Sequence, residues 1–158
     1  MERGLEVHVL DRAGSGPKPE LVRALGATYH TGTVAGIGFE PDIIVECTAV
    51  GELLTSSVQA IAPGGIVCLT SVGAGGSSAG LAPADVAAAF VLRNNLVVGS
   101  VNANKRHWYG TGPAWHWLAP IPAGWRGSSR GAKSPDRFME ALQRKPDDIK
   151  TVIQFADV

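Results

Sequence analysis

Short apolar runs that alternate with helix-like segments constrain the fold of this chain more than any other feature. Each run is rich in β-branched or leucine residues and leads into glycine or polar residues, which is typical of buried strands that end in loops. The strand candidates are residues 5–10, 27–30, 41–51 (with a polar end from Thr48), 66–72 and 96–101. Because helical segments separate them, this spacing predicts an α/β fold with a parallel sheet and helices on both faces.

Proline and glycine mark where the helical segments between the strands begin and end. The stretch 19–26 starts with a proline, has leucine and valine on one face, and places Gly26 where a C-terminal cap belongs. Residues 52–61 follow with helical spacing, and the Ala-Pro-Gly-Gly sequence at 62–65 stops them. Residues 83–93 are an alanine-rich segment that also starts with a proline and is finished at Asn94.

Length, charge and cysteine content narrow the class of protein. The 158 residues suffice for about one domain with its own core. Fourteen basic and fourteen acidic side chains give a formal net charge of zero, so no global field favours nucleic acid or an anionic membrane. Two cysteines are too few for a disulfide framework, and no apolar run has the length of a signal peptide or membrane span. We therefore expect a cytoplasmic protein with a small-molecule ligand.

Asp11 and Arg12 follow the first strand candidate, where an open parallel sheet binds its ligands. In dinucleotide-binding folds an acid at this place accepts hydrogen bonds from the adenosine ribose, and a basic side chain favours a 2′-phosphate. The alternative is a solvated loop with an incidental ion pair. Such folds carry a glycine-rich phosphate loop about 20 residues before the acid, and the glycine clusters at 36–41 and 73–78 lack its spacing. A dinucleotide fold therefore requires that the first strand and the glycine loop precede residue 1.

Residues 110–132 break the regular pattern. They hold five glycines, three prolines, three tryptophans and no acidic residue, and neither a strand period nor a helix period fits them. GC-rich codons read in a shifted frame yield these residue types, so one hypothesis is a frameshifted segment over 110–133; the alternative is a tryptophan-rich partner-binding loop. The expected organisation is a partial dinucleotide-binding domain at 1–109, this aberrant segment, and a helix and strand at 134–158.

Several stretches, in order along the chain, resemble a single family. They read GLEVHVLDR, PELVRALGATY, PDIIVECTA, GGIVCLTSVG, LVVGSVNANKRHW and DDIKTVIQFADV. They resemble the C-terminal coenzyme domain of archaeal-type glucose 1-dehydrogenases, in the zinc-dependent medium-chain dehydrogenase superfamily. The resemblance implies a Rossmann-like, doubly wound sheet. It also implies oxidation of glucose or a related aldose at C1 to the lactone, with NADP or NAD as the coenzyme.

The resemblance also implies a role for particular residues at four strand ends. Asp11 and Arg12 would meet the adenosine ribose and any 2′-phosphate, and Thr48 would lie at the coenzyme cleft. Two further sets would line the nicotinamide side and form the last coenzyme contact, namely Thr70, Ser71 and Val72, and then Ser100, Val101 and Asn102. Asn102 would also reach the sugar. Local alternatives are a helix cap for Thr48 and turn-forming roles for Ser71 and Asn102.

The family places its catalytic domain, with the zinc ligands, before the coenzyme domain. We therefore expect zinc only in that preceding domain, no catalytic or metal-binding residue in this chain, and no activity of the chain alone. The four histidines are scattered without metal-ligand spacing. Two alternatives stay open: another zinc-type alcohol, polyol or threonine dehydrogenase, and a non-catalytic nucleotide-sensing or dimerisation module, whose exposed edge strand 96–101 could pair with a second copy.

Overall fold

The computed structural model describes two compact units of the chain. One unit is residues 32–107, and the other combines residues 1–31 with 108–158. The residues described are 4–73, 83–102, 104–107, 109–110, 131–143, 145, 148–149, 151–153 and 155. Within these ranges no helix is both long enough and apolar enough to cross a membrane.

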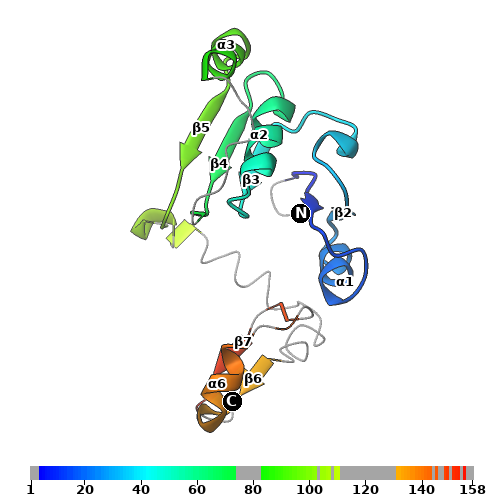
Figure 1. Cartoon of the computed structure of the whole chain (residues 1–158), viewed down its shortest axis with the longest axis vertical. Helices are drawn as coiled ribbons and strands as arrows, with labels where there is room; N and C mark the ends of the chain where they lie inside the picture. Colours follow the sequence, from blue (N-terminus) through cyan, green and yellow to red (C-terminus); the bar gives the residue numbers. More distant parts are fainter. Residues whose placement is uncertain are drawn as a thin grey trace. The chain divides into compact units, whose positions relative to one another are not determined.

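The unit of residues 32–107 is built on a three-stranded parallel sheet with the order β3-β4-β5 (Figure 1). The strands are β3 (Ile43–Glu46), β4 (Ile66–Leu69) and β5 (Leu96–Gly99). The 3-10 turn η1 (Ala35–Ile37) precedes β3, α2 (Gly51–Ala60) follows it, and α3 (Pro83–Arg93) leads into β5. Helices thus alternate with parallel strands, and this part of the sequence-based prediction is confirmed.

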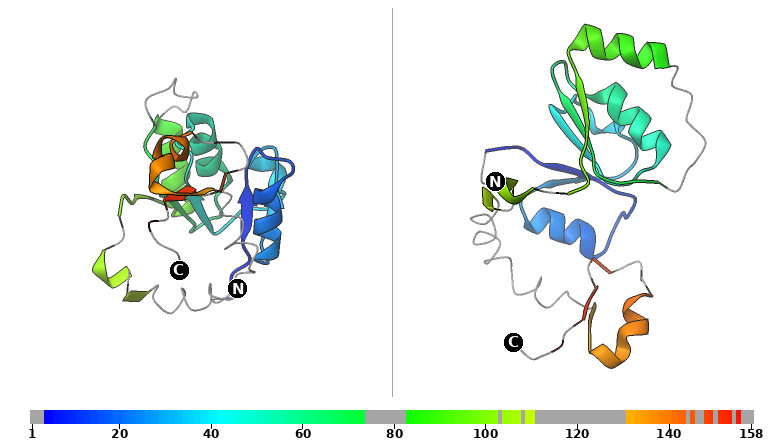
Figure 2. Two further views of the ribbon diagram at one scale, coloured as in Figure 1. Left: turned by 90° about the horizontal axis from the view of Figure 1, so that it is seen from below. Right: turned by 90° about the vertical axis from the view of Figure 1, so that its left-hand side faces the viewer.

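The core of this unit lies on the face of the sheet that α2 covers. Val67, in the central strand, has no exposed surface, and Val58 in α2 and Ile61 directly after it are also buried. Figure 2 shows α2 alongside the sheet, whereas α3 lies beyond the end at which β5 begins. Because side chains alternate along a strand, the opposite face carries a second apolar set, which is exposed: Ile43, Val45, Ile66, Leu96 and Val98.

The second unit contains two parallel strand pairs. β1 (His8–Leu10) pairs with β2 (Thr28–His30), and α1 (Pro17–Ala24) connects the two strands in sequence. β6 (Gly131–Lys133) pairs with β7 (Thr151–Ile153), with the 3-10 turn η2 (Pro135–Arg137) and α6 (Phe138–Ala141) between them in sequence. α1 begins two residues earlier than predicted, because Pro17 occupies a position where a helix needs no N–H. Gly26 follows the helix with a φ of +80°, as predicted for its C-terminal end.

The strand order within each unit agrees with part of the Rossmann order. In that fold the second and third strands lie on one side of the first strand, and the fourth to sixth lie on the other. Among the described residues, β2 is the only strand that pairs with β1, and β4 is the only strand that pairs with β3. One edge of β1 and one edge of β3 are therefore unpaired within these residues. In the Rossmann order both of these strands are neighbours of the first strand. That such a strand and a glycine loop precede residue 1 stays a prediction.

The irregular segment predicted at 110–132 falls mostly outside the description, because residues 111–130 are not described. Its last two residues belong to β6, where Gly131 aligns with Thr151 and Ala132 with Val152. The sequence pattern does not reveal this strand, since Gly-Ala-Lys contains no β-branched residue. Within 134–158, where a helix and a strand are predicted, the structure has the short elements η2, α6 and β7. The shifted reading frame over 110–133 stays a prediction, which translation of the gene in its other two frames tests.

Candidate functional site

Seven of the nine predicted site residues follow the carboxyl ends of the three strands in residues 32–107. Thr48 comes two residues after β3, and the other six directly follow β4 and β5: Thr70, Ser71, Val72, Ser100, Val101 and Asn102. The strands end earlier than the apolar runs suggest. The last ladder bonds run from Thr70 N to the Glu46 carbonyl and from Ser100 N to the Leu69 carbonyl, both at 2.9 Å. Residues beyond these bonds are loop, which frees their backbone groups for a ligand.

Glu46, the last residue of β3, holds the turn at Thr48 in place. The residue is 5% exposed. One carboxylate oxygen accepts hydrogen bonds from the backbone N–H of Thr48, at 2.7 Å, and from the Thr48 hydroxyl. The other accepts from the backbone N–H of Ala49 at 3.1 Å. The turn needs this support, because Ala49 adopts a left-handed φ of 56° that a residue with a Cβ rarely takes.

The Glu46 carboxylate is ionised and has no cationic partner among the described residues. Burial by itself raises the pKa of Glu46, but the hydrogen bonds from Thr48 and Ala49 outweigh burial, so the net pKa lies below its ordinary value of 4.5. A carboxylate that accepts several hydrogen bonds favours its charged form. The sequence gives little sign of this role, because an acid that ends an apolar strand usually points to solvent.

We expect the stability of the chain to fall in acid as Glu46 takes up a proton. The folded pKa is lower than the unfolded one, so its stabilising contribution is complete above pH 4.5 and is lost as the pH falls through the folded pKa. Urea unfolding at a series of pH values measures this loss. Glu46→Gln should remove that acid-dependent part, while Glu52→Gln, at an exposed acid of α2, should retain it. Identical pH profiles for the three proteins would contradict the assignment.

Thr48 forms a local link between the strand and the next helix. Its hydroxyl donates to Glu46 and accepts a hydrogen bond at 3.1 Å from the N–H of Val50, the residue before α2. The single hydroxyl hydrogen is therefore engaged within the protein, so Thr48 can offer a ligand only an acceptor or its methyl group. Thr48 does not cap α2, because the N-cap residue of that helix is Val50 and no side chain forms a cap hydrogen bond there. The coenzyme contact of Thr48 stays a prediction.

The loops after β3 and β4 touch each other near Glu46. The Thr70 hydroxyl donates to the Glu46 carbonyl at 2.9 Å, and a Cβ on Gly73 would lie 2.9 Å from the Ala49 carbonyl oxygen. The Ser71 hydroxyl oxygen is buried and makes no hydrogen bond of normal geometry with any described residue. It nevertheless lies close enough to Glu46 to help lower the pKa of that carboxyl. A buried hydroxyl with unused bonding capacity is costly unless a ligand or water satisfies it.

Two apolar side chains that follow β4 and β5 are exposed to solvent. Val72 is 90% exposed and Val101 is 87% exposed, and Ser100 and Asn102 beside Val101 are also exposed. Exposed valines next to polar backbone groups suit a flat ring that stacks on one side and hydrogen bonds at its edge.

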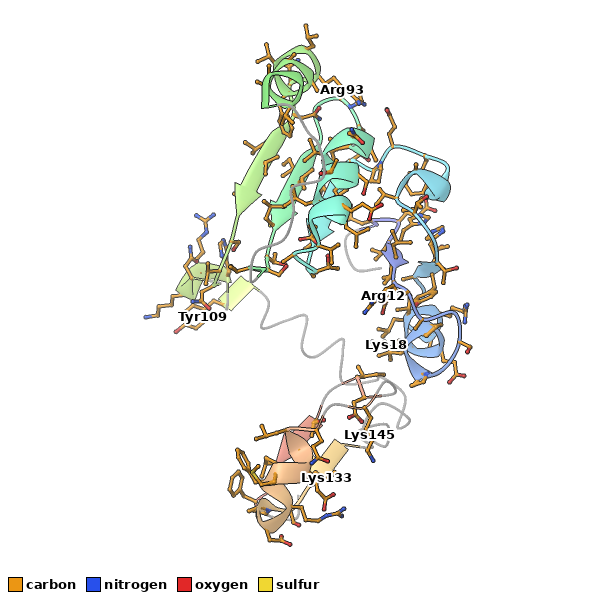
Figure 3. All side chains as sticks on the ribbon, viewed as in Figure 1. Arg12, Lys18, Arg93, Tyr109, Lys133 and Lys145 are labelled. Carbon is orange, nitrogen blue, oxygen red and sulfur yellow. The ribbon has the colours of Figure 1, made fainter. Side chains whose placement is uncertain are left out.

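Asp11 and Arg12 lie in the other unit, directly after β1. The Arg12 N–H donates to an Asp11 carboxylate oxygen at 2.6 Å, and the Lys18 ammonium lies 3.7 Å from the other oxygen. The ion partner of Asp11 is thus Lys18 in α1, which sequence reasoning missed. The Arg12 side chain is exposed, and Figure 3 shows Arg12 and Lys18 projecting from the loop and helix that follow β1. The Tyr29 hydroxyl donates to the Ala13 carbonyl at 2.6 Å and so tethers this loop to β2.

The sequence reasoning also missed a contact between two of the scattered histidines. His8 Nδ1 lies 2.7 Å from His30 Nε2, and His8 Nε2 lies 2.9 Å from a Glu6 carboxylate oxygen. The parallel pairing of β1 with β2 brings these two histidines together. In the described part of the chain no group of three histidine, cysteine or acidic side chains could hold a metal ion.

Comparison with known proteins identifies related sequences along nearly the whole chain. The profile of a family described as "Glucose dehydrogenase C-terminus" matches residues 1–155. Glucose 1-dehydrogenase of Halobacterium salinarum is 32% identical over 152 residues, which is 91% of this chain and 42% of that enzyme. Glucose 1-dehydrogenase 2 of Vulcanisaeta moutnovskia is 38% identical over 91 residues, or 57% of this chain and 26% of that enzyme. The chain spans less than half the length of these relatives.

Solved structures share the fold. The crystal structure of glucose dehydrogenase from Haloferax mediterranei superposes on this chain with a TM-score of 0.80 at 25% identity. The superposition covers 97% of this chain and 44% of the Haloferax chain. A second structure of the Haloferax enzyme, at 24% identity and a TM-score of 0.79, is a complex with NADP, Zn and gluconolactone. Since the family profile extends over all but the last three residues, the chain belongs to the glucose dehydrogenase C-terminal family.

Proposed function

We propose that this chain is the coenzyme-binding portion of an NAD(P)-dependent glucose, or aldose, 1-dehydrogenase. The observation that carries the proposal is the cluster at the carboxyl ends of β3 and β4, where Ser71 has a buried, unsatisfied hydroxyl beside the fixed Glu46 carboxylate. Ligands of open parallel sheets bind beyond these strand ends. Family membership supports the same assignment.

The residues at these strand ends fit a nicotinamide coenzyme. Ser71 would gain a hydrogen-bond partner from the carboxamide or ribose, and the backbone groups of Thr70 and Val72 would line the ring. Ser100, Val101 and Asn102 would form the last contact, with Asn102 also within reach of the sugar. In the complete enzyme, the coenzyme supplies the acceptor for a hydride from C1 of the substrate. This chain's own contribution is to bind the coenzyme and to orient it.

Asp11 and Arg12 would recognise the adenosine end of the coenzyme. The Asp11 carboxylate would accept hydrogen bonds from the ribose hydroxyls, and the exposed guanidinium of Arg12 would bind a 2′-phosphate. Lys18, which pairs with Asp11 at 3.7 Å, adds a second cation for that phosphate. We propose that NADP and NAD are both accepted, with the two cations favouring NADP.

Zinc and catalysis would belong to another part of the enzyme. The chain covers 42% of the Halobacterium enzyme and 44% of the Haloferax enzyme, so we propose that the zinc ligands lie outside residues 1–158 and that the chain alone does not oxidise glucose. Formation of reduced coenzyme by the purified chain with glucose and zinc would contradict this. Activity toward other alcohols or polyols, and pairing of two copies through β5, remain alternatives; the exposed Leu96 and Val98 of β5 are compatible with the latter.

Replacement of Asp11 tests the adenosine assignment. Asp11→Ala should weaken binding of NAD about tenfold or more, because hydrogen bonds to a charged group contribute about 1.5–3 kcal/mol. NADP should lose less, since Arg12 and Lys18 would still hold its phosphate. Calorimetric titration of the chain with each coenzyme measures both constants. Glu20→Ala, which removes an exposed acid from the first turn of α1, is the control and should change neither. Equal losses for NAD and NADP in Asp11→Ala would rule out the assignment.

A further inference from the structure

Glu46 brings an isolated negative charge to the strand ends. The residue is 5% exposed, and its carboxylate accepts hydrogen bonds from uncharged groups only, namely two backbone N–H groups and one hydroxyl. No lysine, arginine or histidine of the described residues forms an ion pair with it. Water therefore screens this charge poorly, and no cation of the described residues pairs with it. Its field acts on whatever binds beside the loops that it anchors.

The loops that Glu46 anchors are those proposed to hold the nicotinamide. Its side chain fixes the backbone of Thr48 and Ala49, and its carbonyl accepts from the Thr70 hydroxyl at 2.9 Å. The Ser71 hydroxyl, buried in the loop after β4, helps to lower the pKa of that carboxyl. The nicotinamide ring carries a positive charge when oxidised and none when reduced. A fixed negative charge beside it therefore stabilises one redox form more than the other.

We infer that Glu46 positions the strand-end loops and that its charge favours the oxidised, cationic nicotinamide over the reduced ring. The inference rests on the proposed coenzyme site and adds to it a residue that acts through the loops it holds and through its charge. At an effective dielectric constant of about 20, a unit charge about 12 Å away changes a binding constant by roughly tenfold. That change applies to the oxidised coenzyme, whereas a loss of positioning weakens both forms alike.

Two substitutions separate charge from positioning. Glu46→Gln removes the charge. It also replaces one carboxylate oxygen, which accepts hydrogen bonds, with an NH₂ group, which is itself a donor and cannot accept them. Glu46→Asp keeps the charge but is one methylene too short to reach the same donors. Glu52→Gln, six residues further on, is the matched control, because it removes one negative charge from an exposed position of α2. Exposed charges are screened by water and salt.

The experiment is a titration of the 158-residue chain and its variants with oxidised and reduced NADP. We expect Glu46→Gln to weaken the oxidised form roughly tenfold more than the reduced form. Glu46→Asp should weaken both by similar factors, and Glu52→Gln should leave the ratio of the two constants unchanged. A ratio in Glu46→Gln equal to that of the wild type would overturn the inference. An equal change of ratio in Glu52→Gln would overturn it as well, since the effect would not be specific to the buried charge.

The outcomes separate this inference from the proposed function. A wild-type chain that binds neither form of the coenzyme overturns the proposed function, and the inference with it. A wild-type chain that binds both forms, with no change of ratio on loss of the Glu46 charge, overturns the inference alone. Circular dichroism checks that each variant is folded. Should Glu46→Gln be unfolded, Glu46→Asp still decides: wild-type affinity for both forms, or a shift toward the reduced form, would contradict the inference.

Discussion

Gly65→Ala should destabilise the three-stranded sheet by about 3 kcal/mol. Gly65 is buried directly before β4, between the starts of β3 and β5. A Cβ at this position would lie 2.8 Å from the Ala62 carbonyl oxygen, 2.9 Å from the Asp42 carbonyl oxygen and 2.6 Å from a side-chain carbon of Ile61. Both carbonyls are held by ladder or turn bonds, from Gly65 N to Ala62 and from Ile66 N to Asp42. The backbone can therefore relieve the clash only by breaking hydrogen bonds.

Gly99→Ala is the matched control for this substitution. Gly99 ends the neighbouring strand β5, where an added Cβ would meet no heavy atom within 4 Å and the φ is not positive. Its replacement should change the free energy of unfolding by less than about 0.5 kcal/mol. Urea unfolding followed by circular dichroism measures both variants. Equal stability of Gly65→Ala and Gly99→Ala would show that the neighbouring backbone does not pass so close to residue 65.

Val67→Ala should have the second largest effect, a loss of about 2–3 kcal/mol. Val67 has no exposed surface in the central strand, where Ile44 and Val97 are its neighbours in register and Val58 and Ile61 share its core. Removal of two methyl groups loses their burial and leaves a cavity that the paired strands cannot close. Val98→Ala makes the same chemical change at an exposed position of β5 and should cost under about 1 kcal/mol. The same unfolding experiment compares them, and a larger loss for Val98→Ala would reverse the assignment of the buried face.

The apolar runs predict which segments form strands, but they place the C-terminal ends of β4 and β5 two or three residues too late. Thr70 and Ser100 make the last ladder bonds through their backbone N–H groups, and Ser71, Val72 and Val101 lie beyond them. Hydrophobic pattern cannot locate this point, because Val72 and Val101 are apolar yet almost fully exposed. An exposed apolar residue after a strand is a departure from pattern, and such departures are expected at functional sites.

The sequence reasoning finds the residues that follow the strands but misses the group that organises them. Glu46 acquires its role from backbone donors of residues two and three positions on, and from burial under the loop after β4. Neither these hydrogen bonds nor this burial can be inferred from the composition of the chain or from the hydrophobic periodicity. Similarly, Lys18 near the start of α1 meets Asp11 across the loop that joins β1 to α1, and His8 meets His30 because the two strands pair in parallel. Contacts of this kind depend on register, which a single sequence does not provide.

The measurement that tests the central claim most directly is a calorimetric titration of the 158-residue chain with oxidised NADP. The claim is that this member of the glucose dehydrogenase C-terminal family carries the coenzyme-binding residues of an aldose dehydrogenase. We expect saturable binding of one coenzyme per chain with a dissociation constant below about 1 mM, weakened in Asp11→Ala. A titration without saturable heat, by a chain that circular dichroism shows to be folded, would contradict the claim.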